Sequence, residues 1–113
     1  MKKIKVTLTN EILELLRKDS LTFDVNMNFL NNSIIDYYTK NEAEREKNTM
    51  KKETELQFFL HKGLKEKYIR TLIARNYKKE VDFLRDIFLE YIKLSIEERK
   101  KIIKMYGLKN KKL

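Results

Sequence analysis

The sequence predicts a mostly helical fold with one short two-stranded antiparallel β-ribbon, built from two successive strand-helix-helix units and a last helix. Three observations predict this fold. The chain of 113 residues begins with strict alternation of apolar and polar residues, which is typical of a half-buried strand. Apolar residues then recur at helical spacing over most of the chain. The same order of patterns also occurs twice, so we infer an internal duplication.

The first unit covers residues 1–40 and begins with the alternating stretch. The apolar side chains on one side of this stretch are Ile4, Val6 and Leu8. They predict a short strand with one buried face. Thr9 then stands before an acidic first turn and is a good N-cap for a helix that we expect to end near residue 18.

Residues 19–24 are a polar connection to a second helix, which begins near Asp24 or Asn26 and ends near residue 40. Residues 41–54 are the most polar stretch of the chain and indicate a linker or an exposed helical extension.

The second, more divergent unit covers residues 55–94. Its alternating stretch at 56–60 matches residues 4–8 at an offset of 52 positions, and Phe83 with Leu84 matches Phe29 with Leu30 at an offset of 54. The two extra residues then fall in the turn between the helices, where insertions are tolerated. The alternative is that two amphipathic segments coincide by chance.

Residues 95–113 are expected to form an amphipathic helix followed by a basic tail. Ser95 and Glu98 have the spacing of a capping box, and Gly107 is expected to end the helix. This helix either packs on the core or binds a protein partner, and the sequence leaves both alternatives open.

A unit of about forty residues with one strand buries too little apolar surface to fold alone, and its strand leaves backbone groups unpaired. Pairing two units solves both problems, because the strands form a ribbon and the four helices share one core. The pairing can occur within one chain or between two chains.

Composition excludes most small-enzyme mechanisms. The chain has no cysteine and one histidine, His61, so it lacks thiolate chemistry and a His-rich metal site. Two glycines rule out a Gly-rich phosphate loop. We therefore expect no enzyme, no cofactor and no metal. No apolar run is long enough to span a membrane, so we expect a cytoplasmic protein.

The net charge of +9 lies entirely in the second half of the chain. Residues 62–79 contain seven basic side chains and one acidic side chain. Residues 99–113 contain seven basic side chains and no acidic one. Such clusters attract polyanions, although a solvated basic face is the simpler interpretation.

The basic alternating strand, the Thr-Asn-Glu helix start and the Phe-Leu-x-x-x-Ile-x-x-Tyr spacing together resemble the ribbon-helix-helix family of Arc- and MetJ-type DNA-binding proteins. The match covers about residues 2–40 and, more loosely, 55–93. Two units in one chain are similar to the tandem ribbon-helix-helix relaxosome proteins of conjugative plasmids. The resemblance implies a tandem pseudo-dimer that binds double-stranded DNA, associated with the nucleoid or a plasmid, with a homodimer or higher assembly on DNA left open.

The resemblance also implies a ribbon that lies in the major groove with its outward side chains on the base edges. The residues implied to contact bases are Lys3, Lys5, Thr7, Gln57 and Phe59. Glu55 lies on the same side of the second strand. An acid and a large aromatic are unusual there, so protein could cover this strand instead.

In the family, backbone amides at the start of the second helix bind phosphate. The phosphate-binding positions implied here are Lys2, Asn26, Asn28, Lys78 and Lys79. Weaker candidates are Lys62, Lys65, Arg70 and Arg75.

Three functions follow in order of preference. The first is sequence-specific DNA binding as a transcriptional repressor or as an accessory protein of a plasmid or mobile element. The second is a partition-type adaptor that binds DNA with its first unit and recruits a protein partner with its second half and last helix. The third is RNA binding by a basic helical protein, favoured only if the first eight residues have no structure.

Overall fold

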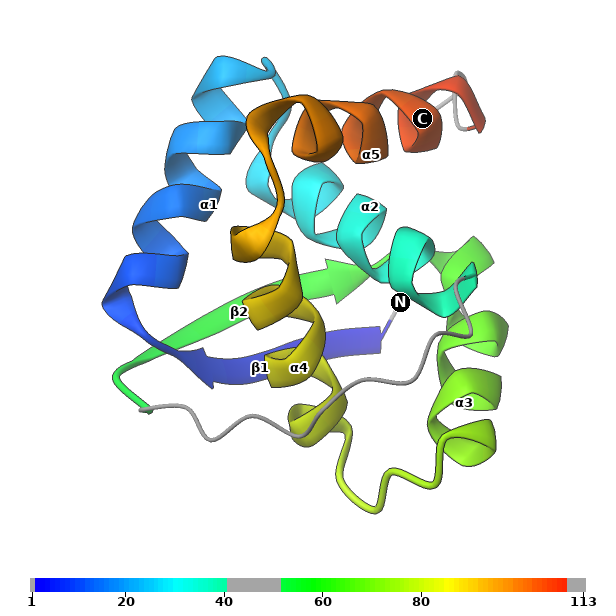
Figure 1. Ribbon diagram of the computed structural model, residues 1–113. Helices are drawn as coiled ribbons and strands as arrows, with labels where there is room; N and C mark the ends of the chain where they lie inside the picture. Colours follow the sequence, from blue (N-terminus) through cyan, green and yellow to red (C-terminus); the bar gives the residue numbers. More distant parts are fainter. Residues whose placement is uncertain (1, 41–51, 110–113) are drawn as a thin grey trace.

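A computed structural model describes residues 2–40 and 52–109. Its elements, in chain order, are β1 (Lys2–Leu8), α1 (Asn10–Thr22), α2 (Met27–Lys40), β2 (Thr54–Leu60), the 3-10 helix η1 (Lys62–Leu64), α3 (Lys65–Ala74), α4 (Glu80–Lys93) and α5 (Ile96–Lys109). The predicted fold class is confirmed: the described chain is mostly helical, and β1 and β2 form a two-stranded antiparallel sheet (Figure 1).

The ribbon forms within one chain and has one buried face. Strand alternation turns one set of apolar side chains toward the helices: Ile4, Val6, Leu8, Leu56, Phe58 and Leu60. α4 packs on β1 and α2 packs on β2, so the helices cover this face and close the core (Figure 1). Lys5 lies opposite Gln57 at the middle of both strands.

The two units have matching backbone elements. β1 and β2 have matching bounds 52 positions apart, and α1 matches η1 plus α3 at the same offset. α1 and α3 also end alike. Asp24 and Asn76 both adopt the left-handed conformation, with φ of 53° and 57°. In both turns the amide of the following residue donates to a carbonyl in the last turns of the helix, as in a Schellman motif. The Val25 amide donates to the Ser20 carbonyl, and the Tyr77 amide donates to the Leu72 carbonyl.

The second helices of the two units match at an offset of 53, not the predicted 54. The bounds of α2 and α4 differ by 53 positions, and burial follows the same alignment, so that Leu30 corresponds to Phe83 and Tyr38 to Tyr91. The turn between the helices therefore has one extra residue. The sequence match of two Phe-Leu pairs was misleading because Phe29 is only half-buried.

α1 is longer than predicted. It continues through residues 19–22, which were expected to form a polar connection. Asp19 is 1% exposed and accepts hydrogen bonds from the Tyr91 hydroxyl (2.6 Å) and from Nε of Arg99 (2.8 Å). A buried carboxylate with two such partners is stable inside a helix, and its charge was the reason that sequence patterns placed it in a loop.

α5 packs on the chain itself, chiefly against α2 (Figure 1). Ser95 caps α5 as predicted, because the Glu98 amide donates to the Ser95 hydroxyl (3.2 Å). The Glu98 carboxylate accepts from the same hydroxyl (3.1 Å), where a full capping box would have it accept from the Ser95 amide. The predicted end at Gly107 is wrong: α5 continues to Lys109, and Gly107 lies over the ring of Phe29. Residues 41–51 of the predicted linker and residues 110–113 of the tail lie outside the described residues. The linker was predicted to run to residue 54, but Thr54 already belongs to β2.

Candidate nucleic-acid interface

The outer face of the ribbon carries six side chains that point away from the helices. Across the two strands they form the pairs Lys3 with Phe59, Lys5 with Gln57, and Thr7 with Glu55. Five of them are exposed and Thr7 is half-exposed. All five side chains predicted to contact bases therefore share one surface, because period-two alternation fixes their side once the strand forms. Phe59 is 47% exposed and no protein segment covers it among the described residues.

The outer edge of β2 is tied to α2 by two asparagines. Asn28 Oδ1 accepts from the Phe59 amide (2.7 Å). Asn32 donates to the Phe59 carbonyl (2.9 Å) and accepts from the His61 amide (2.6 Å). Backbone groups that would be left open at a strand edge are thus satisfied by side chains. The backbone that carries Phe59 is consequently held in place before any ligand binds.

The outer edge of β1 has the corresponding contact. Arg85 Nε donates to the Thr7 carbonyl at 3.1 Å. Arg85 corresponds to Asn32 in the repeat, and Thr7 corresponds to Phe59. The second helix of each unit therefore holds the strand of the other unit, and these contacts join the two units.

The predicted phosphate-binding side chains fall into two groups. Three have partners inside the protein: Lys2 pairs with Glu80 (3.3 Å), Asn26 caps α2 through the Phe29 amide (2.7 Å), and Asn28 binds the ribbon as described. Lys78 and Lys79 are exposed and directly precede the first turn of α4. Of these five candidates, only the lysine pair thus presents free charge at a helix N-terminus, where anions are favoured.

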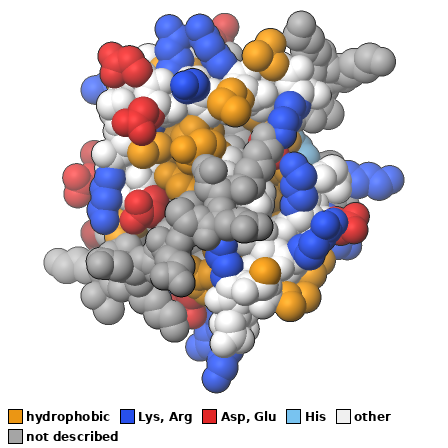
Figure 2. All heavy atoms as spheres, turned by 45° about the vertical axis from the view of Figure 1, so that its right-hand side comes forward, with side chains coloured by type: hydrophobic (Ala, Val, Ile, Leu, Met, Phe, Trp, Pro, Cys, Tyr) orange, Lys and Arg blue, Asp and Glu red, His pale blue; other side chains and the backbone are white. Residues whose placement is uncertain are grey.

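The α3 side of the molecule is rich in basic side chains (Figure 2). Among the weaker candidates, Lys62, Lys65 and Arg70 are exposed, and Arg70 pairs with Glu66 on the same helix (2.9 Å). Such an exposed pair contributes little to stability and leaves the side chain able to exchange partners.

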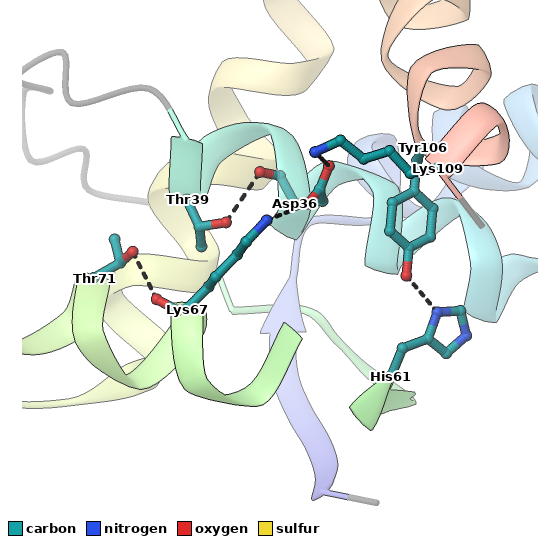
Figure 3. Close-up of polar contacts among 7 residues, drawn as sticks. All are labelled: Asp36, Thr39, His61, Lys67, Thr71, Tyr106 and Lys109. Atoms are coloured by element: carbon teal, nitrogen blue, oxygen red, sulfur yellow. Dashed lines mark hydrogen bonds and ion pairs between the residues drawn. The ribbon is translucent and has the colours of Figure 1, made fainter. Parts of the chain in front are cut away.

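α2, α3 and α5 meet around Asp36, whose side chain is 5% exposed (Figure 3). Lys67 from α3 and Lys109 from α5 pair with its two oxygens, at 3.3 and 3.8 Å. Nearby, the Tyr106 hydroxyl of α5 hydrogen bonds to Nδ1 of His61, and the two rings stack. The Asp36 ion pairs join α3 and α5 to α2, and the contact of Tyr106 with His61 attaches α5 to the end of β2.

The His61 ring has a defined protonation state at this junction. Asn28 Oδ1 accepts from Phe59, so its amide nitrogen faces Nε2 of His61 as a donor (3.1 Å). Nε2 is then the acceptor, and Nδ1 carries the proton toward Tyr106. Burial lowers the pKa of His61 below its usual value.

This geometry predicts a pH-dependent stability. The neutral ring contributes stability fully above the unfolded pKa of about 6.5, and this contribution is lost as the pH falls through the lower folded value. We expect the urea midpoint to fall between about pH 7.5 and about pH 5 by less in His61→Gln than in the original chain. Equal falls in both proteins would show that His61 is not responsible.

Within residues 2–40 and 52–109, no group of three or more His, Asp or Glu side chains is placed to hold a metal ion. In the same ranges, none of the helices is both long and apolar enough to cross a bilayer.

Comparison with known proteins found no matching family model, no matching curated protein and no matching solved structure.

Sequence reasoning did not identify Asn32 and Arg85, which hold the ribbon edges. Asn32 is one of three consecutive small polar residues that are all buried in α2, and a buried asparagine needs hydrogen-bond partners. That signal indicates a role for the asparagine but does not tell which strand it binds.

Proposed function

We propose that this chain is a sequence-specific DNA-binding protein of the ribbon-helix-helix type, in which one chain supplies both strands of the ribbon. It would act in the cytoplasm, on the nucleoid or a plasmid, as a repressor or an accessory protein of a mobile element. One observation carries the proposal: a two-stranded ribbon turns six side chains outward, and most of them can hydrogen bond.

A two-stranded ribbon fits the major groove of B-DNA, which is about 12 Å wide. Lys3 and Lys5 can donate to O6 and N7 of guanine, and Gln57 can bind adenine through both the oxygen and the nitrogen of its side-chain amide. Phe59 can cover a thymine methyl, and Glu55 can accept from N4 of cytosine. The anchoring of both ribbon edges supports this role, because preorganised groups lose less entropy on binding.

Charge supports the same proposal. The net charge is +9, and an anionic duplex attracts such a protein regardless of sequence. Lys78 and Lys79 stand at the start of α4, where a phosphate would meet both the lysines and the helix amides.

The lysine pair gives a prediction on salt dependence. Lys79→Ala should weaken binding about equally on all duplexes and reduce the slope of log K against log salt by about 1. Lys100→Ala, at an exposed position on α5, is the matched control and should leave the slope unchanged. A Lys79→Ala slope equal to that of the control would remove Lys79 from the interface.

The adaptor alternative needs a last helix with a free apolar face. Ile102, Ile103 and Tyr106 of α5 are instead buried on the chain, whereas Ile96, Met105 and Leu108 on the same helix are exposed. The second strand, moreover, belongs to the same ribbon as the first. We therefore favour DNA binding by the whole chain.

The proposal is tested by fluorescence anisotropy with labelled random-sequence DNA duplexes at low and moderate salt. We expect binding that weakens steeply as salt rises. RNA duplexes of the same length are the comparison, since the major groove of A-form RNA does not admit a ribbon. No binding to any DNA duplex at low salt, or a preference for RNA, would overturn the proposal.

A further inference from the structure

The ribbon backbone is close to two-fold symmetric. Its register places Lys5 opposite Gln57, and these two residues also correspond to each other in the repeat. A two-fold axis through this central pair therefore exchanges the two strands. The reciprocal contacts of Arg85 with Thr7 and of Asn32 with Phe59 follow the same axis.

The outward side chains do not follow this symmetry. The corresponding pairs across the axis are Lys3 with Glu55, Lys5 with Gln57, and Thr7 with Phe59. No pair is identical, and one pair has opposite charges. The side chains of β1 are two cations and a hydroxyl, whereas those of β2 are an anion, an amide and an aromatic ring.

We propose that the ribbon recognises a DNA site without two-fold symmetry, and that Glu55, Gln57 and Phe59 specify the half-site that differs. This inference rests on the proposed function. In an inverted repeat the two strands would meet the same base edges. A guanine that accepts hydrogen bonds from Lys3 would, at the symmetric position, present O6 and N7 to the Glu55 carboxylate, which is also an acceptor. An inverted repeat can therefore satisfy only one strand.

The chemistry of each half predicts its bases. Lys3 and Lys5 favour guanine, so the half-site under β1 should be rich in guanine. Gln57 donates to Glu55 at 3.0 Å, which holds the carboxylate beside the amide on the outer face. This pair favours adenine and cytosine in the other half-site, and Phe59 favours thymine.

An asymmetric site also fixes the direction of the protein on DNA. α3, with its exposed Ile69 and Ile73, would always face the same side of the site. A homodimer with two identical strands would have no such direction.

The test is selection of binding sites by the full chain from a library of random duplexes. We expect an enriched site whose halves differ, one of them rich in guanine. Replacing either half by an inverted copy of the other should weaken binding by about tenfold or more for each mismatched base pair. An enriched inverted repeat, or enrichment without base preference, would overturn the inference and leave DNA binding intact. No binding to any duplex would instead overturn the proposed function.

Two symmetrised variants sharpen the test. The triple variant Glu55→Lys, Gln57→Lys, Phe59→Thr makes both outer strands alike and should select an inverted repeat of the guanine-rich half. Lys3→Glu, Lys5→Gln, Thr7→Phe makes the opposite change and should select an inverted repeat of the other half. The exchanged side chains point away from the core, and either variant that folds is sufficient. Selection of the original site by a folded symmetrised variant would contradict the inference.

Discussion

Replacing Lys5 with alanine is expected to lower affinity for the preferred DNA site by roughly 5- to 150-fold, the range for loss of one good side-chain contact to a base. Lys5 lies at the centre of the outer face, opposite Gln57, and is exposed. Affinity for unrelated duplexes should fall only a few-fold, because one of many positive charges is lost. The measurement is anisotropy with the selected site and with a scrambled duplex of the same composition.

Lys101→Ala is the matched control for Lys5→Ala, since Lys101 is an exposed lysine on α5. It should change neither affinity by more than a small factor. If Lys5→Ala lowered affinity equally on both duplexes, direct base readout by Lys5 would be wrong, although contact with phosphate would remain.

Replacing Arg99 with alanine is expected to lower the free energy of unfolding by about 3–5 kcal/mol, the usual cost of breaking a buried ion pair. Arg99 bonds to Asp19, whose side chain is 2% exposed, and also donates to the Leu94 carbonyl at 2.7 Å. Without Arg99 the carboxylate of Asp19 keeps only the Tyr91 hydroxyl as a described partner. The total free energy of unfolding of a small domain is about 5–15 kcal/mol, so this loss is large.

Urea denaturation followed by circular dichroism measures the effect of Arg99→Ala. Lys100→Ala removes the neighbouring exposed charge and should change stability by less than about 0.5 kcal/mol. The double variant Asp19→Asn, Arg99→Met should recover part of the loss, because it leaves no buried charge unpaired. A stability loss below about 1 kcal/mol in Arg99→Ala would mean that the pair is not buried as described.

The sequence predicted the elements whose signals are local. Alternation around Ile4 and Val6 predicted the first strand and its buried face, and Asn26 was one of two predicted caps for α2. The N-cap at Ser95 was also correct. In each case the pattern lies within a few residues, so the local structure is determined by residues that are close in the sequence.

The errors arose where distant residues decide the structure. Asp19 is helical and buried because Tyr91 and Arg99, more than 70 positions away, donate hydrogen bonds to its carboxylate. Gly107 stays inside α5, where the helix packs over Phe29. No local pattern contains these contacts, and a single charge or glycine was therefore assigned to a loop or a helix end.

For the candidate site, alternation within each strand is enough to predict that the outward side chains share one face. It does not supply the register that pairs Lys5 with Gln57, nor the helix contacts that hold the ribbon edges. Those depend on how the two units pack, which the sequence of each unit alone does not specify.

The most direct test of the central claim is an NMR titration of the ¹⁵N-labelled chain with a short DNA duplex at low salt. If the ribbon enters the major groove, the largest amide shifts should occur in β1 and β2, centred on Lys5 and Gln57, with one chain bound per site. Amides of α5 around Lys100 should move little. Shifts confined to the helices, or none at all with a duplex in excess, would contradict the account.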